Sequence, residues 1–391
     1  MREHLSELMK LPSTQSKTTK LQAFLPILTQ GDLDEALVLE VTAVSQTKDD
    51  NLSLSTLNTL LSAKADVNAL KARALCLAIG SADSRIVDPL LHAKPTKQSL
   101  QLAFPHAIHN KDPANRLTFV KRLIDAGAPK LEATRALAYC IDAHTNDMPL
   151  LTLLTEHADT SDGIALMKAI RKESPAIVGL LLDKAKSPIR ATDKSFLQAM
   201  KISDRPERLK IAELLLKSSN IVGKQSISSG LLTAVSDVDY ELGRLLTSAG
   251  ASLADCDSQG IVKASRSGSP EMLSLLLAGM PEPKKEILEE AFQAATEVGD
   301  LKVRTEILEI LLRRGVTGDV VNEQLVSAAR YGEAGHEMLR VLLAAGANLN
   351  YHDGEAVCAA VRSAILPNLE LLLGRELVDL NQVRPFSFLY S

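Results

Sequence analysis

The chain has 391 residues, more than one compact core usually supports, so we expect several domains or one array of repeats. Hydrophobic residues make up 46% of it, which excludes wholesale disorder, and only 3% are aromatic, which favours thin helical layers over a thick β-sandwich core. The formal net charge of −4 argues against a general nucleic-acid-binding protein, although residues 161–224 carry 13 basic and 7 acidic side chains.

The first residues are polar and rich in Ser, Thr and Lys, and we expect residues 1–19 to form a flexible N-terminal segment. Residues 1–30 lack the basic start and apolar run of a signal peptide. The four cysteines are scattered and form no CxxC motif, which indicates a reducing compartment. No apolar run approaches the roughly 20 residues of a membrane span. These features predict a cytoplasmic protein, with the nucleus as the alternative, and no membrane association.

A leucine-rich segment followed by a Gly/Ala turn recurs along residues 20–380. Its clearest copies are residues 123–128, 245–251 and 342–348. The steps between copies run from 28 to 35 residues, so a unit of about 31 residues occurs about eleven times. The copies begin at Leu60, Leu90, Leu123, Leu153, Leu181, Leu215, Leu245, Leu276, Leu311, Leu342 and Leu372.

Each unit contains two apolar segments with helical spacing. The first is Ala-rich, as in residues 74–78, and the second ends in the leucine pair, as in residues 306–312. Small Ala side chains allow neighbouring units to approach closely, and Leu fills the space between layers. Two short helices cannot bury their own apolar faces, so the units must stack. The sequence therefore predicts an all-α helical-repeat solenoid of about eleven helix-turn-helix units, elongated and curved.

The clearest unit has Asp257 and Gly260 in a turn, Ala264 in the next helix, Gly268 after it, and leucines at 275–277. This order resembles the ankyrin repeat, and the Gly-Ala turns are similar to the ankyrin Gly-Ala-Asp-Val-Asn step. The Thr-Pro-Leu-His signature is absent from every unit, and the unit is about two residues shorter than the usual ankyrin repeat. The resemblance implies divergent ankyrin repeats with shortened β-hairpin fingers. HEAT or armadillo pairs, whose units are longer, are the alternative, and tetratricopeptide repeats are disfavoured because their spaced aromatics are missing.

Five units share the pattern Ala-x-Lys/Arg near the end of the first helix. In an ankyrin-like stack this position lies near the concave side, so we expect these residues to contact a partner. A cation at a helix C-terminus also complements the helix dipole, by about 0.3–1 kcal/mol, and that structural role is the alternative. Partner binding predicts that charge reversal weakens partner capture while thermal stability holds. The five basic residues are Arg171, Lys201, Arg266, Arg330 and Arg362.

We find no Walker-type phosphate loop, GxSxG, HExxH or GxGxxG motif. His106 and His109 have no acidic or Cys partner at metal-ligand spacing, and Cys76 and Cys358 occupy equivalent places that suit small buried residues. The sequence therefore predicts no catalytic, cofactor-binding or metal-binding residue, and no cofactor.

These features together favour a non-enzymatic interaction scaffold that binds a protein partner, rather than nucleic acid, on its concave face. A structural spacer in a larger multidomain protein and a host-directed ankyrin-repeat effector are the alternatives. An enzyme whose groups converge from different repeats is less favoured. Residues 381–391 follow what resembles the start of another unit, and we expect them to be an incomplete repeat or a fold-back cap.

Overall fold

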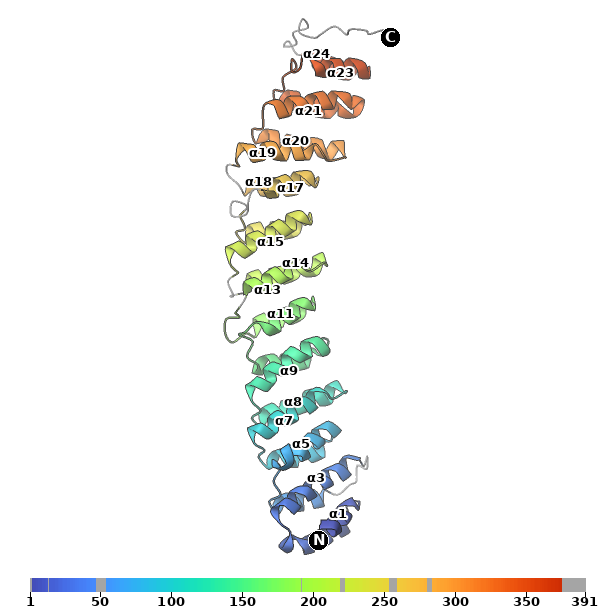
Figure 1. Ribbon diagram of the computed structural model, residues 1–391, viewed down its shortest axis with the longest axis vertical. Coiled ribbons are helices and arrows are strands. Elements are labelled where there is room, and N and C mark those ends of the chain that lie inside the picture. The colour runs from blue at the N-terminus through green and yellow to red at the C-terminus, as the bar shows by residue number, and fades with distance from the viewer. Residues whose placement is uncertain are drawn as a thin grey trace. The chain divides into compact units, whose positions relative to one another are not determined.

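The computed structural model describes residues 2–12, 14–46, 54–190, 192–218, 222–252, 259–279 and 283–374. Within these ranges the chain is helical and contains no strand (Figure 1). The chain divides into two compact units. The first comprises Met1–Ser195 with Ser218–Asn220, and the second comprises Phe196–Lys217 with Ile221–Ser391.

The helices of the first unit follow one another as pairs. The pairs are α1 (Arg2–Lys10) and α2 (Gln15–Phe24), α3 (Gln30–Gln46) and α4 (Ser55–Ser62), α5 (Ala69–Ser81) and α6 (Ser84–His92), α7 (Lys97–Ile108) and α8 (Pro113–Asp125), α9 (Lys130–Ala143) and α10 (Met148–His157), and α11 (Ile164–Arg171) and α12 (Pro175–Asp183). A short 3-10 helix, η1 (Leu25–Ile27), follows α2.

The second unit continues this order after α13 (Thr192–Ala199), which spans the division between the units. The remaining helices are α14 (Arg205–Lys217), α15 (Lys224–Ser236) and α16 (Tyr240–Ser248), α17 (Gln259–Arg266) and α18 (Pro270–Ala278), α19 (Lys285–Ala295) and α20 (Leu301–Arg313), α21 (Asp319–Arg330) and α22 (His336–Ala344) with η3 (Gly332–Gly335) between them, and α23 (Glu355–Ser363) and α24 (Leu366–Leu373).

Contacts between pairs form two layers within each unit. Odd-numbered helices contact odd-numbered neighbours, as α3 contacts α5 and α17 contacts α19, and even-numbered helices contact even-numbered ones, as α8 contacts α10 and α18 contacts α20. Every copy of the leucine-rich segment begins in an even-numbered helix, from Leu60 in α4 to Leu372 in α24. Leu60 and Leu372 themselves are fully buried. The predicted all-α helical-repeat solenoid is therefore confirmed. Its curvature stays a prediction.

The N-terminal segment differs from our prediction, because residues 1–19 contain α1 and the first half of α2. Leu5, Leu8 and Met9 are buried at helical spacing, so a short apolar face is present within a polar sequence. This first pair contacts α3 and α4 and precedes the eleven units that the leucine spacing predicts. Residues 381–391, predicted to be an incomplete repeat or a cap, lie outside the described residues.

A glycine with positive φ ends several even-numbered helices. Gly127 has a φ of 95°, its N–H donates to the oxygen of Ile124 at 2.9 Å, and the N–H of Ala128 donates to the oxygen of Leu123 at 3.0 Å. These are the two hydrogen bonds of a Schellman motif, which glycine completes without steric cost. The same pair of bonds occurs at Gly250 and at Gly346.

The described part of the loop that follows such a turn is held by a side chain of the preceding odd-numbered helix. Ser228 on α15 accepts the N–H of Ser252 at 3.1 Å, and Asn322 on α21 accepts the N–H of Asn348 at 2.7 Å. Side chains thus satisfy main-chain N–H groups in these loops. The described residues of the loops form no strand.

Candidate functional site

Three even-numbered helices, α8, α14 and α20, are 13 residues long and carry a buried arginine as their fourth residue. An aspartate precedes each helix, which gives the pattern Asp-x-x-x-Arg. Each guanidinium donates to a main-chain oxygen six residues earlier, in the turn between paired helices. The arginines are Arg116, Arg208 and Arg304, of which 4%, 3% and 7% is exposed.

Two of these arginines also bind the next helix pair through the residue that caps its even-numbered helix. Arg116 Nη2 donates to Asp147 Oδ2 at 2.8 Å, and Arg208 Nη2 donates to Asp239 Oδ2 at 2.8 Å. Asp147 and Asp239 are the N-caps of α10 and α16. The arginines therefore connect successive pairs at the edge where the paired helices turn.

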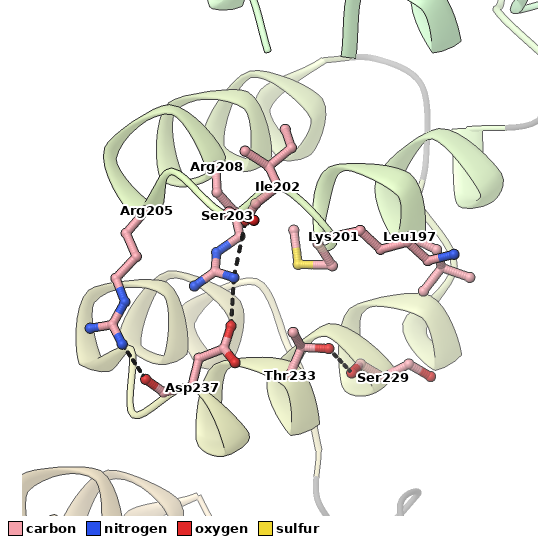
Figure 2. A pocket seen from close by; sticks show the side chains of 10 residues that line it. Leu197, Lys201, Ile202, Ser203, Arg205, Arg208, Ser229, Thr233 and Asp237 are labelled. Carbon is pink, nitrogen blue, oxygen red and sulfur yellow. Dashed lines mark hydrogen bonds and ion pairs between the residues drawn. The ribbon is translucent and has the colours of Figure 1, made fainter. Parts of the chain in front are cut away.

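A cleft with a volume of about 780 Å³ opens beside Arg208, between α13 and α15 and next to the start of α14 (Figure 2). All of its lining residues belong to the second unit. Ser229 and Thr233 of α15 form one side, and Figure 2 shows Arg205 at the opposite end from Leu197. The lining combines apolar side chains with three cations, and its members include Leu197, Met200, Ile202, Lys201, Arg205 and Arg208.

The charge of Arg208 is balanced within the protein. Arg208 Nη1 donates to Asp237 Oδ2 at 2.6 Å, and Nη2 donates to Asp239. Burial lowers the pKa of the guanidinium, but its hydrogen bonds to Asp239 and Asp237 outweigh burial and raise that pKa above its usual value. Arg208 Nε is buried and has no hydrogen-bond partner among the described residues.

The other two cations of the cleft are exposed and not balanced in this way. Arg205 Nη2 donates to the main-chain oxygen of Asp237 at 2.5 Å, which is a neutral acceptor. Within the described part of the chain, the ion pairs include neither Arg205 nor Lys201. The cleft therefore carries a net positive charge at its surface.

A smaller cleft beside Arg116, in the first unit, has a volume of about 560 Å³ and is lined by the start of α8 and the turn between α9 and α10. Pro113 stands at the position of Arg205, so among the lining residues Arg116 alone is permanently cationic. Arg116 Nε donates to Asp147 at 3.0 Å. His144 also lines this cleft, and burial, followed by the neighbouring Arg116 charge, lowers its imidazole pKa.

The five predicted partner-binding residues are all exposed and lie near the C-termini of odd-numbered helices. Each belongs to a different helix pair. Arg266 Nε lies 3.0 Å from Glu297 Oε2, and Arg330 forms an ion pair with Glu355. Each arginine is therefore neutralised by a glutamate of the next helix pair along the chain. Arg171 is the last residue of α11 and Arg362 the last but one of α23, and neither lines either of the two clefts described above. Lys201 alone of the five lines the large cleft. Their role in partner binding stays a prediction.

The buried arginines were not predicted from sequence, although the Asp-x-x-x-Arg pattern is visible there. No group of three or more His, Cys, Asp or Glu side chains within the described ranges is placed to hold a metal ion. Burial raises the pKa of the Cys140 thiol to about 12, so this cysteine is protonated at neutral pH. None of the described helices has both the length and the apolar composition that crossing a membrane requires.

Comparison with known proteins assigns no family, because no family model and no curated protein matches the chain. Among solved structures, the chain is similar to a circular tandem repeat protein described as having a novel repeat topology and enhanced subunit contact surfaces. The two chains are 14% identical, the alignment covers 95% of this chain and 86% of the other, and the TM-score is 0.17. A likeness at this level does not bear on family or function.

Proposed function

We propose that this chain is a non-enzymatic scaffold whose odd-numbered helices hold a protein partner, and that its units are divergent ankyrin repeats. The two-layer packing of helix pairs and the Gly-Ala turns at Gly127, Gly250 and Gly346 support the ankyrin assignment. Stacked repeats present extended surfaces to a partner, and this architecture suits binding over many weak contacts.

Exposed apolar side chains on three consecutive odd-numbered helices carry the proposal. Leu102 on α7, Leu131 and Tyr139 on α9, and Ile164 on α11 are 39%, 54%, 41% and 54% exposed. A groove of about 300 Å³ between α7 and α9 is lined by Phe104 and Tyr139, among others. Of the four exposed residues, Tyr139 lines this groove. Exposed apolar surface is typical of protein-binding sites, and aromatic side chains are enriched at their centres.

The experiment compares two exposed tyrosines. Tyr139 lies on an odd-numbered helix and Tyr240 begins an even-numbered one, and they are 41% and 39% exposed. Wild type, Tyr139→Glu and Tyr240→Glu are immobilised and exposed to native extract, and the retained proteins are quantified by mass spectrometry. We expect Tyr139→Glu to lose proteins that wild type and Tyr240→Glu retain. The proposal fails if no specific set is retained, or if both variants lose it equally at unchanged melting temperature.

A further inference from the structure

We propose that the cleft beside Arg208 binds an acidic segment of a protein partner, with carboxylates of that segment at Lys201 and Arg205. The choice of a peptide as occupant rests on the proposed function. The site itself is separate from the apolar groove at Tyr139 and belongs to the second unit.

The charges that line the cleft favour the binding of an anion. Three cations and one carboxylate line it, and that carboxylate, Asp237, is bound to Arg208 together with the nearby Asp239. Lys201 and Arg205 are thereby left without an ion-pair partner among the described residues. A ligand with two carboxylates could approach both cations without displacing an existing ion pair, and charge-assisted hydrogen bonds of this kind are the stronger ones.

One donor of Arg208 has no acceptor within the described residues. Arg208 is 97% buried, since only 3% of it is exposed, and its Nε has no hydrogen-bond partner in the described residues. At the equivalent arginines Nε is satisfied, because Arg116 Nε donates to Asp147 and Arg304 Nε donates to the oxygen of Val298. Buried polar groups in native structures are normally hydrogen-bonded, so Arg208 is the exception among the three arginines. Its Nε is enclosed by the protein, so an anion in the cleft meets the exposed Lys201 and Arg205 instead.

The rest of the lining favours a peptide over a nucleic acid. Leu197, which is 39% exposed, supplies apolar surface beside the cations, whereas Met200 and Ile202 are buried. A peptide offers apolar and acidic side chains together, whereas a nucleic-acid backbone offers a run of phosphates, for which this cleft has only two exposed cations. The volume of about 780 Å³ accommodates several side chains, within the range of about 300–1,000 Å³ that is usual for ligand pockets.

The test uses a fluorescein-labelled peptide of alternating Glu and Leu, whose binding is followed by fluorescence anisotropy at low and high salt. We expect one saturable site that weakens with salt, because exposed charges are screened. Lys201→Glu and Arg205→Glu should each raise the dissociation constant about tenfold or more, which corresponds to about 1.4 kcal/mol. Both side chains are exposed, so both variants should keep the wild-type circular dichroism.

The matched control is Lys263→Glu, which makes the same change of charge at an exposed residue of α17, in the same unit but not among the residues that line the cleft. It should bind the peptide within about twofold of wild type, as expected of an independent surface site. Absence of saturable binding, or equal weakening by Lys263→Glu, overturns the inference. Stronger binding of a labelled oligouridylate than of the peptide overturns the choice of occupant. Tyr139→Glu should leave peptide binding unchanged. The proposal for this cleft and the proposal for the groove at Tyr139 can therefore fail separately.

Discussion

Arg208 and Asp239 join two successive helix pairs, with Arg208 Nη2 donating to Asp239 Oδ2 at 2.8 Å. The other carboxylate oxygen of Asp239 accepts the N–H of Leu242 at 3.2 Å and caps α16. One side chain therefore neutralises a buried guanidinium and also satisfies a free main-chain donor at a helix start. The cap of one pair and the buried arginine of the preceding pair depend on the same residue.

We predict that Asp239→Ala destabilises this region more than Asp239→Asn does, by about 1 kcal/mol, because Asn keeps a cap acceptor and Ala does not. Both variants remove one of the two carboxylates at Arg208, and Asp237 remains. Hydrogen exchange of the α14 and α16 amides measures the effect. Equal exchange in the two variants would show that the cap contributes nothing here.

The fold could be predicted because the period of the leucines is a direct consequence of stacking. One copy of the segment begins in each even-numbered helix from α4 to α24, since a buried leucine recurs in every unit at the first leucine of the copy or one residue after it. The first pair was missed for the same reason. It has no leucine pair before a Gly/Ala turn, and its apolar face rests on only a few residues such as Leu5, Leu8 and Met9.

The candidate site could be predicted only in part. Lys201 was found because it belongs to a recurring pattern near the ends of the odd-numbered helices, and it lies two residues after α13 ends. The sequence grouped it with four residues that do not line this cleft. Arg208 was missed because its burial depends on Asp239, which lies 31 residues away. Sequence spacing cannot distinguish such an arginine from a solvated one until the layering of the helices is known.

Gly163 and Gly127 provide a matched pair of left-handed glycines. A Cβ at Gly163 would lie 2.5 Å from the oxygen of Arg190, whereas a Cβ at Gly127 would meet nothing within 4 Å. Both have positive φ, so alanine at either position costs about 1–2 kcal/mol in backbone strain. We predict that Gly163→Ala lowers the thermal midpoint further than Gly127→Ala, as measured by far-ultraviolet circular dichroism. Equal midpoints would mean that the loop carrying Arg190 moves aside freely.

Lys17 holds the first helix pair through a fully buried ion pair. Its Nζ lies 2.5 Å from Glu40 Oε2 and donates to the main-chain oxygens of Met9 and Leu11 at 2.8 and 2.9 Å. We predict that Lys17→Met costs about 3–5 kcal/mol locally, because it leaves the buried carboxylate without its ammonium. Lys17→Met combined with Glu40→Gln removes both charges and should recover much of the loss. Proteolysis near α1 measures both effects, and equal cleavage of the single and double variants would contradict the prediction.

The pH dependence of stability should show the contribution of His144. Burial and then the Arg116 charge lower its pKa in the folded protein, and its Nε2 is buried without a hydrogen-bond partner among the described residues. As pH falls below the usual imidazole value of 6.5, the unfolded chain takes up the proton first, so stability is lost toward acid. Asp83 and Asp159 also have lowered pKa values, but these carboxylates affect stability only in more acidic solution, near and below the usual aspartate pKa of 3.8. We therefore predict that the thermal midpoint falls more for wild type than for His144→Gln between about pH 7.5 and about pH 5.5. An equal fall in both proteins would show that the imidazole titrates alike in the folded and unfolded chains.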